Sequence, residues 1–374
     1  MELIEDRVLL LLSIKEKGKK ISIDHIAEKV IRDEKNCINE SQIKDAIDRL
    51  ISKGLISESN KNYYATERGI QEIKERVKSI GNKLNLSYRM ILTAKEYYPQ
   101  IADAIIPFLK ERATSVVKIF SDEKDPVNKI KPLFVRYAKY KPKPVNIQIN
   151  NTKDLIKYVE SHAIDFIPYI HRINTKDPDW FVLDLDAGPS FDKHERGFYL
   201  VKLTAKKLVE TLEEYEISSC IKFSGSRGIQ VWSSLENSKL PSGDIFSLYR
   251  KFAQQIQTKL EEKLQELPSK TLKEFYEIVK TGKPITTSTV AKKAERSDQI
   301  LIDWSTMKPS GDVRAPFSLH YKTTLVSCPI DPKRLLLFEL SEARTENVVD
   351  NLERLIDIFK LEKSDPSQII KEVS

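Results

Sequence analysis

The sequence predicts an α/β (α+β) protein, with a core of mixed sheets flanked by helices and a small helical domain before it. In residues 145–235, helical and extended periodicities alternate, with polar turns between them, which is typical of an α/β sheet core. Residues 1–75 instead have the pattern of three helices followed by a hairpin. At 374 residues, the chain is long enough for two or three domains with at least one sizeable core.

Composition and charge narrow the class of protein. The 62 Lys and Arg residues exceed the 55 Asp and Glu residues by 7, a mild basic excess that is compatible with nucleic-acid binding but does not establish it. Cys37, Cys220 and Cys328 are isolated, so neither a disulfide scaffold nor a cysteine zinc ribbon is expected. The apolar run near the N-terminus lacks the basic flank and the length of a signal or membrane segment. We expect a cytoplasmic protein with no membrane partner.

Residues 1–75 resemble a winged-helix domain. Ser22 or Asp24 can cap a short helix, and a helix with apolar residues at helical spacing follows Asn39 and ends at Gly54. Two short extended runs around SNKN then form the expected wing, and residues 76–90 form a helical connector.

The third helix of this domain has a face of mixed charge. Its expected exposed residues are Lys44, Asp45, Asp48, Arg49 and Lys53. A helix that is dedicated to reading DNA is usually more basic. Contact with DNA and docking of a protein partner therefore both remain open for this domain.

The second domain is predicted over residues 91–340, followed by a helical tail over residues 341–374. An amphipathic helix from Leu92 leads into a β-branched strand, VVKIF, where helical spacing ends. Asp125-Pro126 and the KPKP of residues 141–144 mark loops. Residues 243–280 form a long helical stretch, a strand follows at residues 299–304, and residues 343–361 form one more amphipathic helix.

Acidic residues interrupt two apolar strands. In WFVLDLDAG, residues 180–188, Asp184 and Asp186 alternate and therefore share one face at the end of a hydrophobic strand. Carboxylates this close repel unless a positive charge lies between them. Mg²⁺ or Mn²⁺ can supply that charge, because these ions prefer the oxygen ligands that carboxylates provide. Asp303 in QILIDW adds a third acid, as a two-metal phosphoryl-transfer site requires. The alternative for the pair is a solvated strand end.

A turn of small residues, SGSRG at residues 224–228, lies between two predicted strands. The hydroxyl of Ser224, the guanidinium of Arg227 and the backbone amides of the glycines can cradle phosphates. Lys222 adds charge on the same face, and Arg314 and His320 lie on a further strand as candidate cations beside a phosphate. A tight hairpin with an incidental arginine, and an ordinary surface histidine, are the alternatives.

These features belong to a series of motifs that resembles the archaeo-eukaryotic primase superfamily, and within it the polymerase domain of bacterial ligase D. The resemblance covers roughly residues 90–335 and depends on the order of the motifs more than on any one of them. The motifs are LTAKEYYPQIADAIIPFLKERATSVVKIF, DFIPYIHRINTKDPDWFVLDLDAGPS, IKFSGSRGIQVW, TTSTVAKKAERSDQILIDW and RAPFSLHYKTTLVSCPI.

The resemblance implies a two-layer α/β catalytic core that transfers nucleotidyl groups onto a 3′-hydroxyl. By motif position, Asp184, Asp186 and Asp303 match the metal-binding acids of the family, which implies Mg²⁺ or Mn²⁺ as cofactor. The implied nucleotide-binding residues are Lys222, Ser224, Arg227, Gln230, Arg296, Arg314 and His320, and the implied DNA-binding residues are Arg136 and Lys293.

Two positions depart from the family pattern. Gln230 and Ile167 stand where histidines are usual. A glutamine can donate a hydrogen bond to a phosphate oxygen but brings no positive charge, so weaker triphosphate binding is expected. We predict a DNA-directed nucleotidyltransferase of DNA repair or replication, which uses primer-template or gapped DNA and nucleoside triphosphates. The alternative is a catalytically weakened or inactive DNA-binding or assembly subunit, with a protein partner on the winged helix.

Overall fold

The computed structural model describes residues 2–14, 21–33, 38–80, 86–122, 124–125, 128–175, 177–280, 282–288 and 298–373. By its internal contacts the chain divides into two compact units. Unit 1 comprises residues 1–102, 116–135 and 151–165, and unit 2 comprises residues 103–115, 136–150 and 166–374. Within the described ranges, no helix combines the length and the apolar character needed to cross a bilayer.

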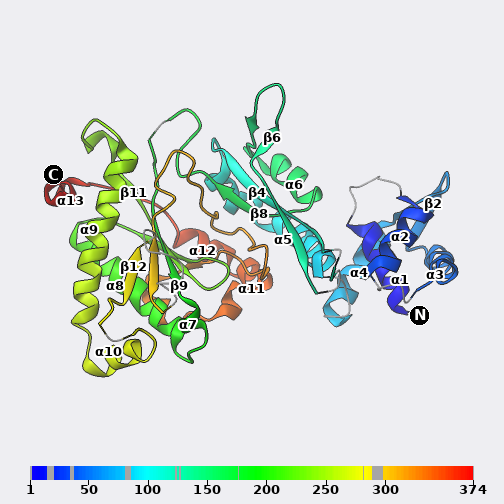
Figure 1. Ribbon diagram of the computed structural model, residues 1–374. Coiled ribbons are helices and arrows are strands. Elements are labelled where there is room, and N and C mark those ends of the chain that lie inside the picture. The colour runs from blue at the N-terminus through cyan, green and yellow to red at the C-terminus, as the bar shows by residue number, and fades with distance from the viewer. Residues whose placement is uncertain are drawn as a thin grey trace. The chain divides into compact units, whose positions relative to one another are not determined.

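Unit 1 begins with a helical domain that carries a small antiparallel sheet (Figure 1). Its helices are α1 (Glu2–Ser13), α2 (Ile23–Asp33), α3 (Glu40–Ser52) and α4 (Glu67–Ile80), and its strands are β1 (Ile21–Ser22), β2 (Ile56–Ser59) and β3 (Asn62–Ala65), in the order β1-β3-β2. Asn39 caps α3. Its side-chain oxygen accepts a hydrogen bond from the backbone N–H of Gln42, and the side-chain oxygen of Gln42 accepts one from the backbone N–H of Asn39. This capping box fixes where α3 begins.

A buried acid on α1 binds the basic end of α3. Both oxygens of the Glu5 carboxylate, whose side chain is 6% exposed, accept hydrogen bonds, from Arg49 Nε and Lys53 Nζ at 2.6 Å each. Burial opposes ionisation of this acid, but the bonds from Lys53 and Arg49 prevail and lower the pKa of Glu5. Two of the three basic residues expected on the exposed face of α3 therefore serve the internal packing of the domain.

A three-stranded sheet follows in chain order, with helix α5 (Leu86–Leu109) before it. The strands β4 (Thr114–Ser121), β5 (Ile130–Val135) and β8 (Ala163–Pro168) pair in the order β5-β4-β8, and α6 (Thr152–Glu160) precedes β8. The predicted change from helix to β-branched strand occurs between α5 and β4. The helix begins at Leu86, several residues before the predicted start, because SYRMI extends the same apolar face.

Unit 2 is built on a mixed seven-stranded sheet. Its strands are β9 (Phe181–Ala187), β10 (Cys220–Phe223), β11 (Ile229–Leu235), β12 (Thr286–Ser288), β13 (Ile300–Asp303), β14 (Pro329–Ile330) and β15 (Lys363–Ser364). The order is β12-β13-β9-β11-β10-β14, with β15 beside β11. The central strand β9 runs antiparallel to both of its neighbours, whereas β12 runs parallel to β13. The predicted mixed sheet is confirmed.

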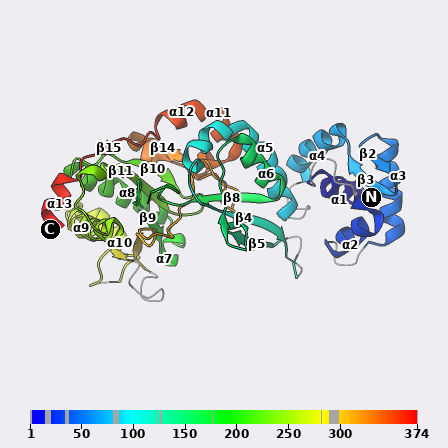
Figure 2. The ribbon, with the colours of Figure 1, turned by 90° about the horizontal axis from the view of Figure 1, so that it is seen from above.

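Helices cover the sheet of unit 2 (Figure 2). Helix α8 (Gly197–Glu214) packs on β9 and β11 and contacts α9 (Ile245–Gln265). The remaining helices of unit 2 are α7 (Pro189–Asp192), α10 (Ser269–Tyr276), α11 (Thr345–Asp350), α12 (Leu352–Asp357) and α13 (Ser367–Val373), and a separate hairpin joins β6 (Tyr137–Lys139) to β7 (Val145–Asn146).

The prediction of one helix over residues 343–361 is wrong. The segment forms two short helices, α11 and α12, which meet at Asn351. Asn351 has a φ of −114° and a ψ of 16°, outside helical geometry, and its side chain donates a hydrogen bond to the Asn347 carbonyl. A side chain that bonds to the backbone in this way competes with the helix, so the apolar periodicity continues while the helix does not.

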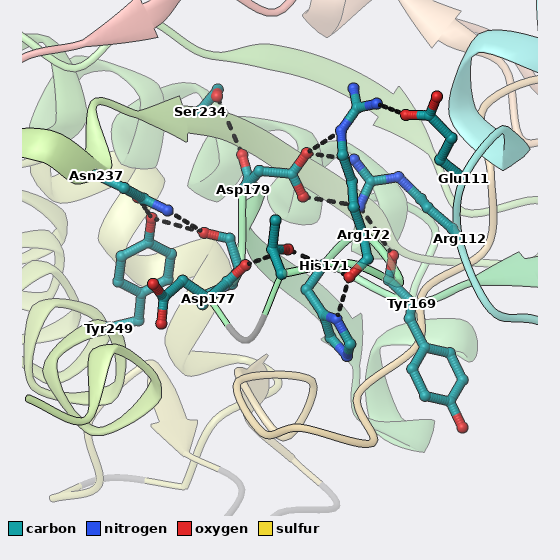
Figure 3. Close-up of polar contacts among 12 residues, drawn as sticks. Glu111, Arg112, Tyr169, His171, Arg172, Asp177, Asp179, Ser234, Asn237 and Tyr249 are labelled. Carbon is teal, nitrogen blue, oxygen red and sulfur yellow. Dashed lines mark hydrogen bonds and ion pairs between the residues drawn. The ribbon is translucent and has the colours of Figure 1, made fainter.

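A buried arginine fixes the beginning of β9 (Figure 3). Arg112 is 1% exposed and binds both carboxylate oxygens of Asp179, at 2.7 and 2.5 Å, and the Tyr169 carbonyl at 3.1 Å. Its guanidinium carbon lies 3.4 Å from the ring centroid of Trp180. Arg172 contacts the same carboxylate at 3.4 Å from a half-exposed position. The bidentate pair and the stacked ring hold the two residues that directly precede β9.

Replacing Arg112 by methionine is expected to lower the free energy of unfolding by about 3 kcal/mol, since it breaks a buried pair and leaves Asp179 with its weaker partner. Urea unfolding, followed by circular dichroism, measures this change. Arg172→Met is the control and should cost less than about 1 kcal/mol, because its ion pairs are half exposed. Equal losses of stability in the two variants would contradict this account of the clamp that Arg112 forms with Asp179 and Trp180.

Candidate active site

Four of the predicted site residues lie in one row across the sheet of unit 2. In the strand register, Lys222 on β10 faces Gln230 on β11, Gln230 faces Asp184 on β9, and Asp184 faces Asp303 on β13. Residues opposite each other on neighbouring strands share a face, with their Cβ atoms about 5 Å apart. The register thus brings together an ammonium group, an amide and two carboxylates from three separate regions of the sequence.

The amide of Gln230 is bonded to the acid beside it. Gln230 is 3% exposed, and its Nε2 donates a hydrogen bond to Asp184 Oδ2 at 2.8 Å. Its Oε1 accepts one from Trp232 Nε1 at 3.3 Å. The other oxygen, Asp184 Oδ1, is shielded from solvent and has no hydrogen-bond donor among the described residues. The sequence predicts a phosphate contact for Gln230, whereas here its side chain bonds to Asp184.

Lys222 stands at the β10 end of the row. Its side chain is fully buried, and Nζ donates a hydrogen bond to Ser327 Oγ at 2.5 Å. The same Nζ lies 5.2 Å from the centroid of the Trp232 ring. Lys222 therefore supplies a buried positive charge next to Gln230, where the sequence predicts a charge exposed toward a nucleotide.

The turn between β10 and β11 lies against Asp186. The Gly228 amide donates to Ser224 Oγ at 3.1 Å, and the Ser224 amide donates to the Gly228 carbonyl at 2.9 Å. A Cβ on Gly228 would lie 3.0 Å from Asp186 Oδ1 and 2.6 Å from the Leu185 carbonyl oxygen, so only glycine permits this approach. The hydroxyl of Ser224 and the carboxylate of Asp186 consequently both lie against Gly228.

Side chains from residues 314–323 hold the turn in position. Arg314 Nη1 donates to the Ser224 carbonyl at 2.8 Å, and Thr323 Oγ1 donates to the Gly225 carbonyl at 2.5 Å. Gly225 has a φ of +93°, and an added Cβ there would lie 2.8 Å from the Cβ of His320. These contacts shape the turn before any ligand binds.

The two acids of β9 have strongly perturbed acidities. Burial, and after it the charge of Asp186, raises the pKa of Asp184 to about 8. Burial also raises the pKa of Asp186, with Asp303 adding to the effect and Arg227 and Arg314 opposing it. Two carboxylates in a low dielectric each favour the protonated form unless a cation compensates.

His320 is not the cation that the sequence predicts. It is 7% exposed, and burial, with the charges of Arg314 and Lys322 adding to it, lowers its pKa to about 3. Its Nδ1 accepts a hydrogen bond from the Lys322 amide at 3.2 Å. The neutral ring therefore carries its proton on Nε2 and can act as a hydrogen-bond donor.

The acids fit a divalent cation by their chemistry. No three His, Cys, Asp or Glu side chains in the described part of the chain stand in the geometry of a formed metal site. Nevertheless, the unpartnered Oδ1 of Asp184 and the raised pKa values of Asp184 and Asp186 are what a cation would relieve. Asp303 accepts a hydrogen bond from the Ser305 amide at 2.6 Å and lies next to Asp184 in the register.

The remaining predicted residues lie apart from the row. Arg227 Nη1 donates to Asp192 Oδ2 at 3.1 Å, an exposed pair. Arg136 directly precedes β6 and lies 3.8 Å from Asp312. Lys293 and Arg296 are outside the described residues.

Sequence reasoning missed Asp192, Trp232 and Ser327, the partners of Arg227, Gln230 and Lys222. The alternation of Gln230 and Trp232 in GIQVW places both on one face and could have indicated that pair.

Comparisons with known proteins agree with the motif order. A family model described as LigD, primase-polymerase domain, matches residues 93–359. Among solved structures, the polymerase domain from Mycobacterium tuberculosis ligase D in complex with DNA is similar, with a TM-score of 0.51 and 17% sequence identity over 70% of this chain and 91% of that chain. At this identity the likeness concerns the fold. No curated protein sequence matches the chain significantly.

The raised pKa of Asp184 predicts how stability depends on pH. The folded protein holds this proton more tightly than the unfolded chain, so the contribution is fully present below the ordinary value of 3.8 and is lost as the pH rises to about 8. Between pH 5 and pH 8, the metal-free protein should therefore lose stability, and Asp184→Asn should lose less. Urea unfolding in a chelator measures this. Asp45→Asn, on the exposed face of α3, should behave as wild type; parallel profiles for all three proteins would contradict the prediction.

Proposed function

We propose, from the premise that the chain belongs to the LigD primase-polymerase family, that it is a DNA nucleotidyltransferase that adds nucleotides to a 3′-hydroxyl. The observation that carries this proposal is the pairing of Asp184 with Asp303 in the sheet register, with Asp186 against the phosphate-type turn. Asp184, Asp186 and Asp303 are the residues that would hold Mg²⁺ or Mn²⁺. When bound, such cations neutralise charge on a triphosphate and favour ionisation of the attacking hydroxyl.

The side chains around the acids would bind the triphosphate. Ser224 Oγ accepts a hydrogen bond from Gly228 and keeps its own proton to donate. His320 can donate from Nε2, and Arg227 can exchange Asp192 for a phosphate oxygen, because that ion pair is exposed and worth little. Gln230 is bonded to Asp184, so its lack of charge does not by itself argue against a working site. Filling of gaps in DNA repair, or synthesis in replication, is the proposed role.

A basic hairpin offers a surface for DNA. Residues 136–146, which include β6 and β7, contain Arg136, Lys139, Lys141 and Lys143 and no acid. All four are exposed, and Tyr140 is 61% exposed among them. Lysines neutralise phosphates and an exposed aromatic ring can stack on a base, a combination typical of proteins that bind single-stranded DNA. The polymerase domain from Mycobacterium tuberculosis ligase D is described in complex with DNA, which supports this assignment.

The N-terminal winged helix would dock a protein partner. Arg49 and Lys53 both form ion pairs with Glu5. Of the three basic residues on the predicted α3 face, Lys44 is the one that takes no part in this contact. The aspartates at positions 45 and 48 are exposed beside it. This face is therefore ill suited to a DNA phosphate backbone.

Primer extension with Mn²⁺ tests the activity. We expect wild type to lengthen a labelled primer on a gapped template, and Asp184→Ala and Asp186→Ala to lower the rate by at least about 10³-fold, since each loses a proposed cation ligand. Calorimetry with a nucleoside triphosphate and Mn²⁺ accompanies the assay. Equal extension by all three proteins, or no saturable binding by wild type, would refute the proposal in favour of the non-catalytic alternative.

The hairpin predicts the salt dependence of DNA binding. Changing Lys139, Lys141 and Lys143 to glutamine should reduce the slope of log affinity against log salt by about 2, near 0.7 for each phosphate contact with a single strand. Fluorescence anisotropy with a labelled oligonucleotide measures the slope. The triple change of Lys251, Lys270 and Lys273 on α9 and α10 removes the same charge, and Lys44→Gln tests α3. An equal loss in a control would show that binding follows net charge alone.

A further inference from the structure

Gln230, one of the two positions at which this chain departs from the family pattern, has a defined bonding partner on each side. Gln230 lies between Trp232, two residues on along β11, and Asp184, opposite it on β9. An indole N–H can only donate. The amide must therefore present its oxygen to Trp232, and this leaves its NH₂ group for Asp184 Oδ2.

This arrangement distinguishes the two oxygens of Asp184. Oδ2 accepts from Gln230 Nε2 at 2.8 Å, whereas Oδ1, which is shielded from solvent, has no donor among the described residues. An oxygen in such a place is stabilised by a hydrogen bond or by a cation. Gln230 engages one lone pair of Oδ2, so Oδ1 is the oxygen that offers both of its lone pairs to a metal ion.

We propose that Gln230 is a positioning residue for the cation site, held by Trp232, and that it fixes the Asp184 carboxylate so that Oδ1 is directed to Mg²⁺ or Mn²⁺. The proposal rests on the function proposed above and deepens it. Residues that bond a metal ligand from behind typically change metal affinity 10- to 100-fold when they are removed. The glutamine is on this account a working replacement for the usual histidine, because a neutral imidazole can also donate on one side and accept on the other.

Lys222 explains why an amide suits this position. It faces Gln230 from β10, and its Nζ is bonded to Ser327. In the strand register Gln230 lies between Lys222 and Asp184, so the hydrogen bond that Asp184 Oδ2 receives from β11 comes from a neutral amide. A direct ion pair would neutralise the charge that a metal ion needs from its ligand.

The test measures Mn²⁺ affinity directly, by electron paramagnetic resonance of free Mn²⁺, with the full chain and no nucleotide. Gln230→Met keeps the length of the side chain and removes both hydrogen-bonding groups. We expect its Mn²⁺ dissociation constant to rise 10- to 100-fold. Gln230→His should remain within about threefold of wild type, because it can restore both bonds.

A double variant separates positioning from stability. In Gln230→Met, the Trp232 N–H loses its acceptor, which lowers the melting temperature. Adding Trp232→Phe removes that unpaired donor but leaves a cavity among the packed rings, so the double variant should melt below Gln230→Met while its Mn²⁺ affinity stays at the Gln230→Met level. Gln299→Leu is the matched control: Gln299 is 6% exposed, and its amide donates to the carbonyls of Pro284 and Thr286. It should lose stability and keep its Mn²⁺ affinity.

The outcomes are distinct. Wild-type Mn²⁺ affinity in Gln230→Met, or an affinity that rises and falls with the melting temperature across the four variants, would overturn the positioning role and leave the proposed activity intact. A wild-type protein that binds no Mn²⁺ would overturn the proposed function, and this inference with it. A selective loss in the Gln230→Met proteins, rescued by histidine, would establish the role.

Discussion

The mutual repulsion of Asp184 and Asp186 is the constraint on which the site depends. Both project from one face of β9 and are half-buried. Burial raises the pKa of both, so the fold loses stability if it ionises them without compensation. Nearby polar groups reduce this cost: the Gln230 amide donates to Asp184, and the charges of Arg227 and Arg314 oppose the rise in the pKa of Asp186. A pair of acids that is kept at this cost marks a candidate functional site rather than a feature that favours stability.

The strand that carries the acids is anchored at its other end. Arg112 binds Asp179 and stacks on Trp180 just before β9 begins, and Trp180 lies 4.8 Å from Trp232 between ring centroids. Trp232 in turn donates to Gln230. Packed aromatic rings adopt few alternative positions, so continuous packing joins the pair of Arg112 and Asp179 to the acid site. This packing opposes a shift of the strand that would relieve the repulsion between the acids.

Much of this site could be predicted from the sequence, because its strongest signals are local. Alternation places Asp184 and Asp186 on one face, and glycines with hydroxyls predict the turn. The motif order also indicates the family, which the match over residues 93–359 confirms. Strand register is not local, however. That Gln230 and Asp303 both face Asp184 follows from pairings between segments far apart in the sequence, and periodicity within one strand does not specify its partner. Lys222, in contrast, faces Gln230 across the short turn of residues 224–228.

The same limitation explains why Gln230 is easily misjudged. In a motif, it is a neutral residue at a position that usually carries a histidine, and the inference of weaker phosphate binding assumes that the side chain faces the phosphate. In the fold, its two hydrogen bonds are made to Asp184 and Trp232, and both could equally be made by a neutral imidazole. The relevant property at this position is then the ability to donate to a carboxylate and accept from an indole at once. Charge at residue 230 is a secondary matter, because Lys222 already supplies it one strand away.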